Sequence, residues 1–441
     1  MRIRDPIHGT IPVGDPEVPL LDSRFFQRLR NVRQLGFGEL AFPGATHTRF
    51  AHSLGAMHVA TRLFDTVFAR ASVPGPERVR MRQAVRVAVL CHDIGHMPLS
   101  HASERIAPTR AALGLPGWLC EPSEGQADHE DFTARILLDS SFTPVLEGQL
   151  GPFGLSPAAI VSLVSGVEPP GGSAFVAGGR DFMPVLRQLV SGELDSDRMD
   201  YLQRDSAFTG VNYGRFDLDW LVQNLMPIES EGRVYLALAK AAIFAFEDFL
   251  LSRFHMFVSV YFHHTSVNFD EMLRRYYLEE PGGFEIPADP ERFVDCDDVT
   301  LATALRRSSN RWARRIVGRH GYKLVAQATE LDRDYDFDAI SQALGAEGIE
   351  HFRSESLGVL SKYLADGGGP PLYVVDPHAG TTTPIADYTP LYQRYAGALH
   401  LKRVYCAPEK AERARQLVLG AVRGVRQGRS AEQTASDERR R

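Results

Sequence analysis

The chain has 441 residues, 44% of them hydrophobic and 24% charged, with a net charge of −6 at pH 7, which is typical of a globular protein and supplies no basic field for nucleic acid. This length allows two or three compact units. The four cysteines are scattered and form no CxxC pair, and the sequence shows no signal-peptide pattern and no apolar run long enough to cross a bilayer. These features predict a cytoplasmic protein, with neither a membrane nor nucleic acid as its main partner.

Helical spacing dominates the first quarter of the chain after a short start. Apolar residues recur every three or four positions over 23–37, 49–71 and 77–96, so each segment is predicted to form a helix. The third helix is expected to stop at Gly95. Prolines and glycines interrupt residues 106–128, which predicts a loop with short helical pieces.

The middle of the chain is predicted to be helical as well, with one short strand. The expected helices lie at 130–138, 181–207, 217–226 and 241–279. A Gly-rich loop is expected at 166–180 and a strand at 233–238.

Residues 280–290 contain several prolines and glycines and are predicted to be a linker, after which the residue pattern changes from helical to mixed helix and strand. Strands are predicted at 371–376 and 402–406, and a helix at 409–422. We therefore predict a mainly α fold with a helical core over 1–290, a smaller C-terminal α+β region over 291–425, and a disordered polar tail over 426–441.

The sequence CHDIGHMPLSH, residues 91–101, places three histidines and an aspartate after an apolar run. Imidazole nitrogens and carboxylate oxygens both bind divalent ions. The candidate ligands are His52, His92, Asp93 and Asp197. Two histidines with two carboxylates leave open positions on an octahedral ion for water and substrate oxygens. An isolated His-Asp dipeptide carries little weight.

A second unusual segment is ELDSDRMDYLQRDSAF. On a helix, Asp197, Tyr201 and Asp205 fall at i, i+4 and i+8, on one face. An aromatic ring between two carboxylates favours a surface that faces a ligand. The alternative is a solvated helix with ion pairs such as Asp200–Arg204.

Together these segments resemble the HD-domain superfamily of metal-dependent phosphohydrolases, because the order His52, His92-Asp93, Asp197 is similar to the H…HD…D signature. DPIHGTI, FQRLRNVRQLG, FPGATHTRFAHSLG, CHDIGHMPLSH and DSDRMDYLQRD are similar to its deoxynucleoside triphosphate triphosphohydrolase branch. The resemblance implies an HD-domain helical core and an enzyme that cleaves a dNTP into deoxynucleoside and inorganic triphosphate.

The resemblance also implies roles for individual residues. The metal ligands would be His52, His92, Asp93 and Asp197, which suit Mn, Mg, Fe, Zn or Ni. The residues that would face phosphate are Arg49, His96, His101, His129 and Arg198, with His101 and His129 as general-acid candidates. Tyr201 and Asp205 would hold the sugar, and Gln34 would contact its 3′ side. Arg253 would contact the terminal phosphate, and Tyr261 would pack under the 2′ carbon, where a 2′-hydroxyl would lack space and a partner.

Regulated relatives bind a guanine nucleotide near the N-terminus, between subunits. The matching positions are Asp22, Gln27 and Arg30, so activation by GTP or a dNTP is an expectation, as is a homo-oligomer, either dimer or tetramer. The alternative is that these three residues form a helix N-cap and its solvated first turns. His47 and His58 match no motif and are expected to be structural or at the surface.

Two other functions fit the same residues. One is an HD phosphohydrolase for another nucleotide, such as ppGpp, a nucleoside monophosphate or an oligonucleotide. The other is a nucleotide sensor with vestigial hydrolysis, whose output is a conformational change. The bond that is cleaved distinguishes these functions from the leading one.

Overall fold

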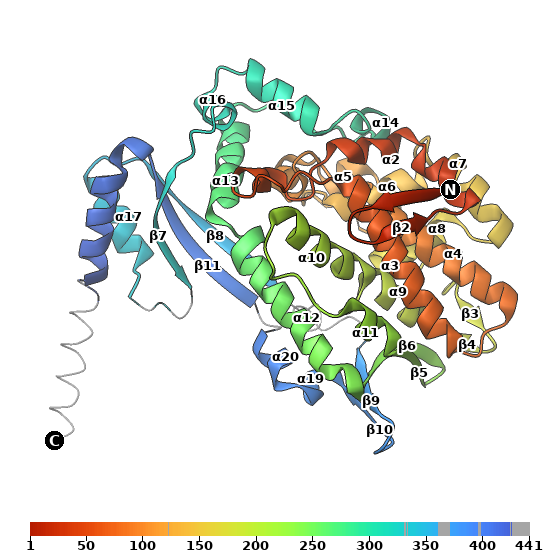
Figure 1. Ribbon diagram of the computed structural model, residues 1–441. Coiled ribbons are helices and arrows are strands. Elements are labelled where there is room, and N and C mark those ends of the chain that lie inside the picture. Colours follow the sequence, from red (N-terminus) through yellow and green to blue (C-terminus); the bar gives the residue numbers. More distant parts are fainter. Residues whose placement is uncertain are drawn as a thin grey trace, which may run out of the picture.

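The computed structural model describes residues 1–121, 123–329, 332, 334–359, 371–395, 398–423 and 425. Figure 1 shows a large, mostly helical body and a smaller sheet-containing part at the left of the view, built from the C-terminal third. The prediction of a mainly α fold is confirmed. The tail predicted at 426–441 lies outside the described residues. No described helix has the length and apolarity of a membrane span.

The chain opens with a hairpin and several short helical pieces. Their bounds are β1 (Arg2–Asp5), β2 (Gly9–Pro12), α1 (Val18–Leu21) and α2 (Arg24–Arg28). The single helix predicted over 23–37 is wrong beyond its first turns. Val32 is extended, and the Gln34 N–H donates to the His47 carbonyl oxygen at 3.1 Å, which carries the chain away from helical geometry.

Three helices form the centre of the body, namely α3 (Arg49–Ala69), α4 (Gly75–Cys91) and α10 (Ser196–Thr209). The helix α3 packs against both of the others. Met57, Leu63 and Phe64 on α3 are fully buried, and each such side chain contributes roughly 1.5–3 kcal/mol when removed from water. The helix predicted at 49–71 is confirmed. The helix predicted at 77–96 is confirmed only as far as Cys91, because α4 ends directly before His92 and not at Gly95.

Shorter helices surround this centre, with bounds α5 (Arg110–Leu113), α6 (His129–Leu138), α7 (Thr143–Leu150), α8 (Pro157–Ser165), α9 (Met183–Ser191) and α11 (Leu218–Gln223). The helix α8 packs against both α4 and α6. The predicted helix at 130–138 is confirmed. The helices α7 and α8 were not predicted.

The helix predicted over 181–207 is in fact two helices, α9 and α10, with a break at Gly192. Gly192 is extended, and a Cβ there would overlap the Gln188 backbone. Asp195 then caps α10, accepting from the Arg198 N–H at 2.8 Å. The break places Asp197 in the first turn of α10, where the helix dipole favours a carboxylate.

The long helix predicted over 241–279 is also divided. Its parts are α12 (Ile243–Met256), a π-helical turn at Phe257–Tyr261 and α13 (His264–Glu279). Turns of π-helix are rare in proteins, and those that occur often lie at functional sites. This one carries Tyr261 at its end.

One sheet joins distant parts of the chain. Its strands are β3 (Val176–Ala177), β4 (Arg180–Asp181), β5 (Leu225–Ser230), β6 (Arg233–Ala239), β9 (Tyr373–Asp376) and β10 (Thr381–Pro384). The predicted strand at 233–238 is β6, which pairs antiparallel with β5 and parallel with β9, where Ala237 lies opposite Tyr373. The strand predicted at 371–376 therefore returns to the helical body.

The smaller part contains an antiparallel sheet in the order β7-β11-β8 (Figure 1). Its elements are β7 (Lys323–Thr329), α17 (Phe337–Ala346), β8 (His351–Val359), β11 (Ala398–Cys406) and a helix over 411–423. Both helices pack on the sheet through Leu344, Val404 and Ala414. The connection from the body runs through α14 (Pro290–Phe293), α15 (Asp298–Arg307) and α16 (Arg311–Val317). The strand predicted at 402–406 and the helix predicted at 409–422 are confirmed within this part.

Candidate active site

The four predicted metal ligands come together where α3, α4 and α10 meet. His52 lies in the first turn of α3, His92 and Asp93 follow α4, and Asp197 begins α10. His52 Nε2 lies 2.9 Å from Asp197 Oδ1 and 3.6 Å from Asp93 Oδ2. His92 Nε2 lies 3.3 Å from Asp93 Oδ1 and 3.5 Å from Asp197 Oδ1. The structure thus gathers residues that are far apart in sequence around one point.

The orientation of the two histidines fits a divalent ion. His52 Nδ1 lies 2.8 Å from Asp200 Oδ2, and His92 Nδ1 lies 2.6 Å from the Val89 carbonyl oxygen. Both partners are acceptors, so the outer nitrogen of each ring carries the proton. Each inner Nε2 is buried and makes no hydrogen bond of good geometry. An outer nitrogen that donates to the protein, with an inner nitrogen left for the ion, is the usual arrangement of metal-binding histidines.

The carboxylates determine the charges in this cluster. Burial lowers the pKa of His52, but the neighbouring carboxylates of Asp197 and Asp200 outweigh it and raise that pKa to about 10. Burial raises the pKa of Asp93, but Arg49, followed by His92 and His96, holds it well below its ordinary value. A divalent cation competes with protons for the same nitrogens, so metal binding here is expected to release protons.

Asp200 supports this cluster from behind. Its two oxygens lie 2.8 and 2.9 Å from Arg204 nitrogens, which is the ion pair expected from the spacing, yet both side chains are fully buried rather than solvated. Asp200 also lies 2.6 Å from His8 Nε2, so it fixes His52 between several partners. Gly55 leaves room for this contact, because a Cβ there would overlap Asp200 and Arg204.

The turn after α4 is held by a buried arginine that the sequence analysis did not single out. Arg28 donates to the carbonyl oxygens of Ile94 and His96, at 2.9 and 2.6 Å. Gly95 allows α6 to approach, because a Cβ there would overlap the backbone of His129 and Thr133. The turn therefore brings His96 beside His129.

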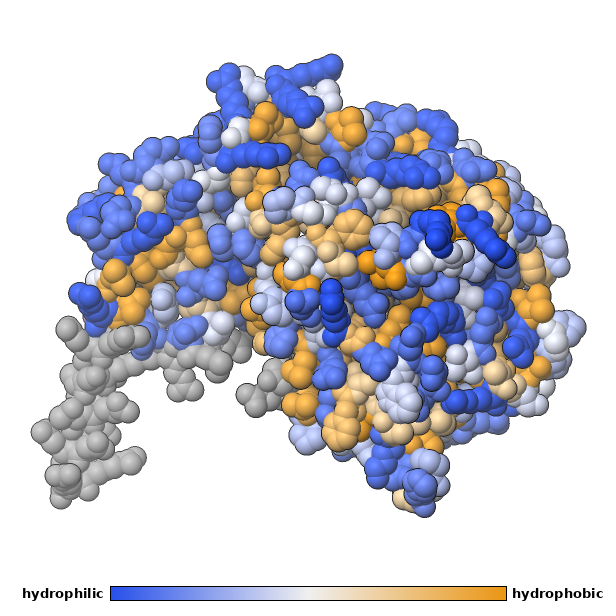
Figure 2. Space-filling view, in the orientation of Figure 1, coloured by the Kyte–Doolittle hydropathy of each residue, from blue (hydrophilic) through white to orange (hydrophobic). Residues whose placement is uncertain are grey.

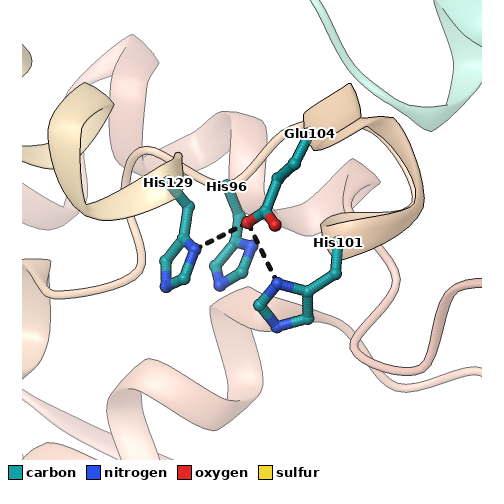
Figure 3. A group of neighbouring side chains, drawn as sticks. All are labelled: His96, His101, Glu104 and His129. Atoms are coloured by element: carbon teal, nitrogen blue, oxygen red, sulfur yellow. Dashed lines mark hydrogen bonds and ion pairs between the residues drawn. The ribbon is translucent and has the colours of Figure 1, made fainter. Parts of the chain in front are cut away.

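A second cluster of side chains consists of His96, His101, Glu104 and His129 (Figure 3). Glu104 Oε1 lies 3.0 Å from His101 Nδ1 and 2.8 Å from His129 Nδ1. Burial lowers the pKa of His129, but Glu104 outweighs it and raises the pKa. The sequence analysis predicted the three histidines and missed Glu104, which orients two of them.

This second cluster is better suited to proton transfer than to a shared metal ion. The rings of His96 and His129 are stacked, with centroids 4.0 Å apart and planes 11° from parallel. A metal ion lies near the plane of each imidazole that binds it, so two parallel rings at this separation cannot bind one ion together. Glu104 and the histidines instead form a hydrogen-bonded group at the wall of a cavity.

One cavity of about 630 Å³, large enough for a nucleotide-sized ligand, joins the two clusters. The predicted residues that line it are Gln34, Arg49, His92, Asp93, His96, His101, His129, Asp197, Tyr201, Asp205 and Tyr261. Ser354 and Glu355 of β8 also line it, so the C-terminal sheet forms part of the wall.

At the predicted sugar end, Asp205 is held from two sides. The Tyr261 hydroxyl donates to Asp205 Oδ2 at 2.9 Å, and His47 Nε2 lies 2.7 Å from Asp205 Oδ1. The rings of Tyr201 and Tyr261 meet edge to face, with centroids 5.9 Å apart. His47 is therefore structural, as expected, but it acts on a residue of the site.

Of the three arginines predicted to bind phosphate, one lines the cavity and two do not. Arg49 lines the cavity, and its Nη1 donates to Asp93 Oδ2 at 2.7 Å. Arg198 and Arg253 do not line it: they lie 3.9 and 3.7 Å from Glu193, an acidic residue that the sequence analysis passed over. Arg198 also donates to the Gly192 carbonyl oxygen. The local acidic residues and the break before α10 draw these two side chains away from the cavity.

The three predicted regulatory residues lie outside this cavity. Gln27 donates to the Leu21 carbonyl oxygen at 2.7 Å, and Arg30 Nε donates to Gln27 Oε1 at 2.7 Å. Asp22 is exposed and precedes the N-cap of α2, which is Ser23. The ring of His58, the other histidine without a motif, lies 5.4 Å from that of His8.

Two known protein families match parts of the chain. An HD domain matches residues 49–204, and an HD-associated region matches residues 216–353. The first match contains the residues of both clusters, and the second contains Arg253, Tyr261 and the first residues of β8.

Similar proteins extend over most of the chain. An uncharacterised protein of Methanocaldococcus jannaschii is 32% identical over 330 residues, which is 75% of this chain and 60% of that protein. The deoxynucleoside triphosphate triphosphohydrolase SAMHD1 of Homo sapiens is 28% identical over 302 residues, 64% of this chain and 45% of that protein. A crystal structure of a hypothetical protein from Aquifex aeolicus matches 95% of this chain and 99% of its own, at 26% identity and a TM-score of 0.72. The chain thus spans only about half to 60% of the curated relatives it matches.

Proposed function

This chain belongs to the HD-domain phosphohydrolase family, and from that premise we propose that it cleaves deoxynucleoside triphosphates into deoxynucleoside and inorganic triphosphate. The observation that carries the proposal is that one cavity joins a His/Asp cluster suited to a divalent ion, a group of hydrogen-bonded histidines, and a tyrosine-lined end. These three parts match the chemistry of a metal-dependent step, a polyphosphate and a sugar.

His52, His92, Asp93 and Asp197 would hold the divalent ion. Such an ion supplies Lewis-acid polarisation of a phosphate oxygen and lowers the pKa of water. Arg49 adds a positive charge at the same wall. Charge neutralisation and positioning are the main contributions that a protein makes to phosphoryl chemistry.

The histidines beside Glu104 would supply the proton for the leaving oxygen. His101 is largely exposed at the cavity wall, and His129 is more buried and holds its proton through Glu104. Both Nδ1 atoms face the same carboxylate oxygen, so Glu104 fixes the tautomer and direction of each ring. A proton donor of this kind contributes about 10²–10⁴-fold to a rate.

At the other end, Asp205 and Tyr261 would select the sugar. The hydrogen bond between them holds the Tyr261 ring at the wall of the cavity. A 2′-hydroxyl placed against that ring would lose its hydration without gaining a partner, which disfavours ribose.

The test is identification of the products from each of the four dNTPs with a divalent ion. Release of inorganic triphosphate together with deoxynucleoside is the expected result. Release of pyrophosphate or orthophosphate would contradict the cleavage site, and hydrolysis of ppGpp, nucleoside monophosphates or oligonucleotides alone would transfer the proposal to another nucleotide. Tight binding without turnover would identify a sensor.

The double variant His92→Ala/Asp93→Ala is expected to lose bound metal and activity together. Its control is His378→Ala/Asp387→Ala, which removes an exposed histidine and an exposed aspartate that do not line the cavity. Full activity in the first variant, or equal loss in the control, would contradict the assignment of the site.

Assembly as a dimer or tetramer, and activation by GTP or a dNTP, are part of the proposal and are tested by light scattering with and without these nucleotides.

A further inference from the structure

The smaller C-terminal part contacts the helical body beside the segment that carries Tyr261. Its sheet lies next to the junction of α12 and α13 in Figure 1, and in Figure 2 the two parts meet at the left of the view. Phe269 and Met272 of α13 share one apolar cluster with Phe352 of β8 and Tyr405 of β11. The sheet therefore packs against a helix that begins three residues after Tyr261.

A buried arginine lies at the centre of this contact. Arg403 is in β11, the central strand of the sheet, and is only 3% exposed. Its guanidinium donates from Nε to Gln327 Oε1 at 2.8 Å, from Nη1 to Ser356 Oγ at 3.2 Å, and from Nη2 to the Phe262 carbonyl oxygen at 2.6 Å. Burial lowers the pKa of Arg403. A buried charge is costly unless it is well hydrogen-bonded, so these three contacts fix the guanidinium in one place.

One of the three hydrogen bonds leaves the sheet. Gln327 is in β7 and Ser356 is in β8, so the first two bonds join neighbouring strands. The third reaches Phe262, directly after the π-helical turn, where the chain interrupts its helix before α13. No backbone N–H of the described residues donates to the Phe262 carbonyl oxygen. Arg403 thus supplies the donor that the end of this turn lacks.

A second side chain of β11 makes a similar contact. Tyr405 lies two residues after Arg403, and its hydroxyl donates to the His264 carbonyl oxygen at 2.9 Å. Phe262 and His264 flank His263, the N-cap residue at which α13 begins. Two side chains of one strand therefore hold the backbone on both sides of the break between the turn and the helix.

The contact continues through aromatic rings to the catalytic cavity. A Cβ at Gly358 of β8 would come within 3.0 Å of the rings of Phe257 and Phe262, so glycine lets the strand approach them. The Phe257 ring meets the Tyr261 ring edge to face, with centroids 5.1 Å apart. The Tyr261 hydroxyl donates to Asp205. Tyr261 is thus held by Asp205 at its hydroxyl and by the sheet through the turn that carries it.

We propose that Arg403 is a positioning residue for sugar selection, which holds the turn so that the Tyr261 ring stays against the 2′ carbon of the bound nucleotide. This role rests on the proposed function, in which that ring disfavours a 2′-hydroxyl. Without the guanidinium, the Phe262 carbonyl oxygen would lose its donor in a partly buried place, and the peptide after Tyr261 would turn to find another. The ring would then leave its position, and a ribonucleotide would be accepted more readily.

The test compares hydrolysis of each dNTP and of its ribonucleotide counterpart by the full chain. The quantity measured is the ratio of kcat/KM for the dNTP to kcat/KM for the rNTP. Arg403→Met keeps a long side chain and removes its donors, and it is expected to lower this ratio at least about tenfold. A purely structural loss would lower both rates alike, so an unchanged ratio would overturn the proposal. Tyr405→Phe removes one hydroxyl and is expected to lower the ratio severalfold, and it decides the question if Arg403→Met does not fold.

The matched control is Arg353→Met, which changes an arginine of the same sheet that pairs with Asp338 of α17 at 2.6 Å and does not line the cavity. An equal fall of the ratio in this control would overturn the role of Arg403. A double variant gives a second check, because Arg403→Met should lower the ratio no further once Tyr261→Ala has removed the ring. A further fall of the same size would show that Arg403 does not act through Tyr261.

Binding in the absence of metal separates the role of Arg403 from the proposed function. Titration calorimetry in EDTA, with dATP and ATP as probes, is expected to show tighter binding of dATP to the unaltered protein and loss of most of that preference in Arg403→Met. An unchanged preference in the variant, or equal binding of both probes to the unaltered protein, would overturn the proposal. An unaltered protein that hydrolyses no nucleotide would contradict the proposed function, and the calorimetric preference would still decide the role of Arg403.

Discussion

Glu104 shows how one side chain can set the direction of several others. A single carboxylate oxygen is the acceptor for two imidazoles, and the third ring of the cluster stacks against one of them. Because the carboxylate favours the protonated ring, it keeps a proton available on His129 at a pH where a free imidazole would be largely neutral. Glu104 is thus a positioning residue for the proposed proton donors.

The substitution Glu104→Gln is expected to lower kcat by about 10²-fold with little change in KM, since it removes orientation and charge but no contact to the substrate. The pKa of His129 is raised by Glu104, so activity that needs protonated His129 is lost only as pH rises through that raised value. In the variant the alkaline limb of the kcat profile should move to lower pH.

Steady-state rates across pH check this expectation. The control is Glu130→Gln, which changes an exposed carboxylate of the same cavity that raises the pKa of His129 less than Glu104 does, so a smaller shift is expected. An unchanged alkaline limb in Glu104→Gln, or an equal shift in the control, would show that His129 is not the titrating donor.

Residues differ in how well the sequence could predict them. His92 and Asp93 are adjacent, and the order of His52 and Asp197 around them resembles a known signature, so all four could be named. Glu104, Arg28 and Asp200 could not be given their places, because their importance depends on which partner they meet in space. Arg198 and Arg253 were expected at the phosphates, but the acidic Glu193 lies between them.

At the scale of elements, close helix packing creates the site. The helices α3 and α10 approach closely enough at Gly55 that Asp200 reaches His52 from behind. A side chain at position 55 would separate the helices or displace the Asp200–Arg204 pair. Small residues at such crossings therefore affect metal affinity without touching the ion.

The substitution Gly55→Ala is expected to destabilise the protein by about 1–3 kcal/mol through overpacking and to weaken metal binding. Gly148→Ala, in the interior of α7 with open space around it, should instead stabilise by about 0.5–1 kcal/mol because alanine is the better helix former. Urea unfolding and metal titration measure both effects. A Gly55→Ala protein as stable as the parent, with unchanged metal affinity, would contradict the close contact.

The sequence predicted helices well where one apolar repeat runs through the whole helix. It predicted them poorly where a glycine or a tertiary contact ends the helix although the repeat continues. The helices α3 and α4 follow their apolar repeat from end to end. The repeat also continues across Gly192 and across Phe257–Tyr261, so the sequence predicted continuous helices there. The breaks are set by packing and by the Asp195 cap, and they are what bring Asp197 and Tyr261 to the cavity.

At the scale of the whole molecule, the His/Asp cluster ties together three segments that are far apart in the chain. The Nε2 atoms of His52 and His92 are buried without a hydrogen bond, and the carboxylates of Asp93 and Asp197 face them. A divalent ion that binds there would bind the folded state and not the unfolded chain. Its binding free energy would then add to the free energy of unfolding.

Removal of divalent ions with a chelator is expected to lower the unfolding midpoint by a few degrees, since an ion at 100 times its Kd stabilises by about 2.7 kcal/mol. Restoring Mn²⁺ or Mg²⁺ should reverse the change, as followed by circular dichroism. In Asp197→Asn the response to the chelator should be lost or much reduced. A full response in that variant would place the stabilising ion elsewhere.

The parallel pairing of β6 with β9 has a consequence for how the protein is made. On the ribosome, β6 emerges more than 130 residues before the strand that covers part of its edge. Growing chains that have not yet reached β9 expose that edge, and unpaired strand edges are prone to associate. The helical body is therefore expected to complete its sheet only after nearly the whole chain has been synthesised, so nascent fragments should need protection from one another until then.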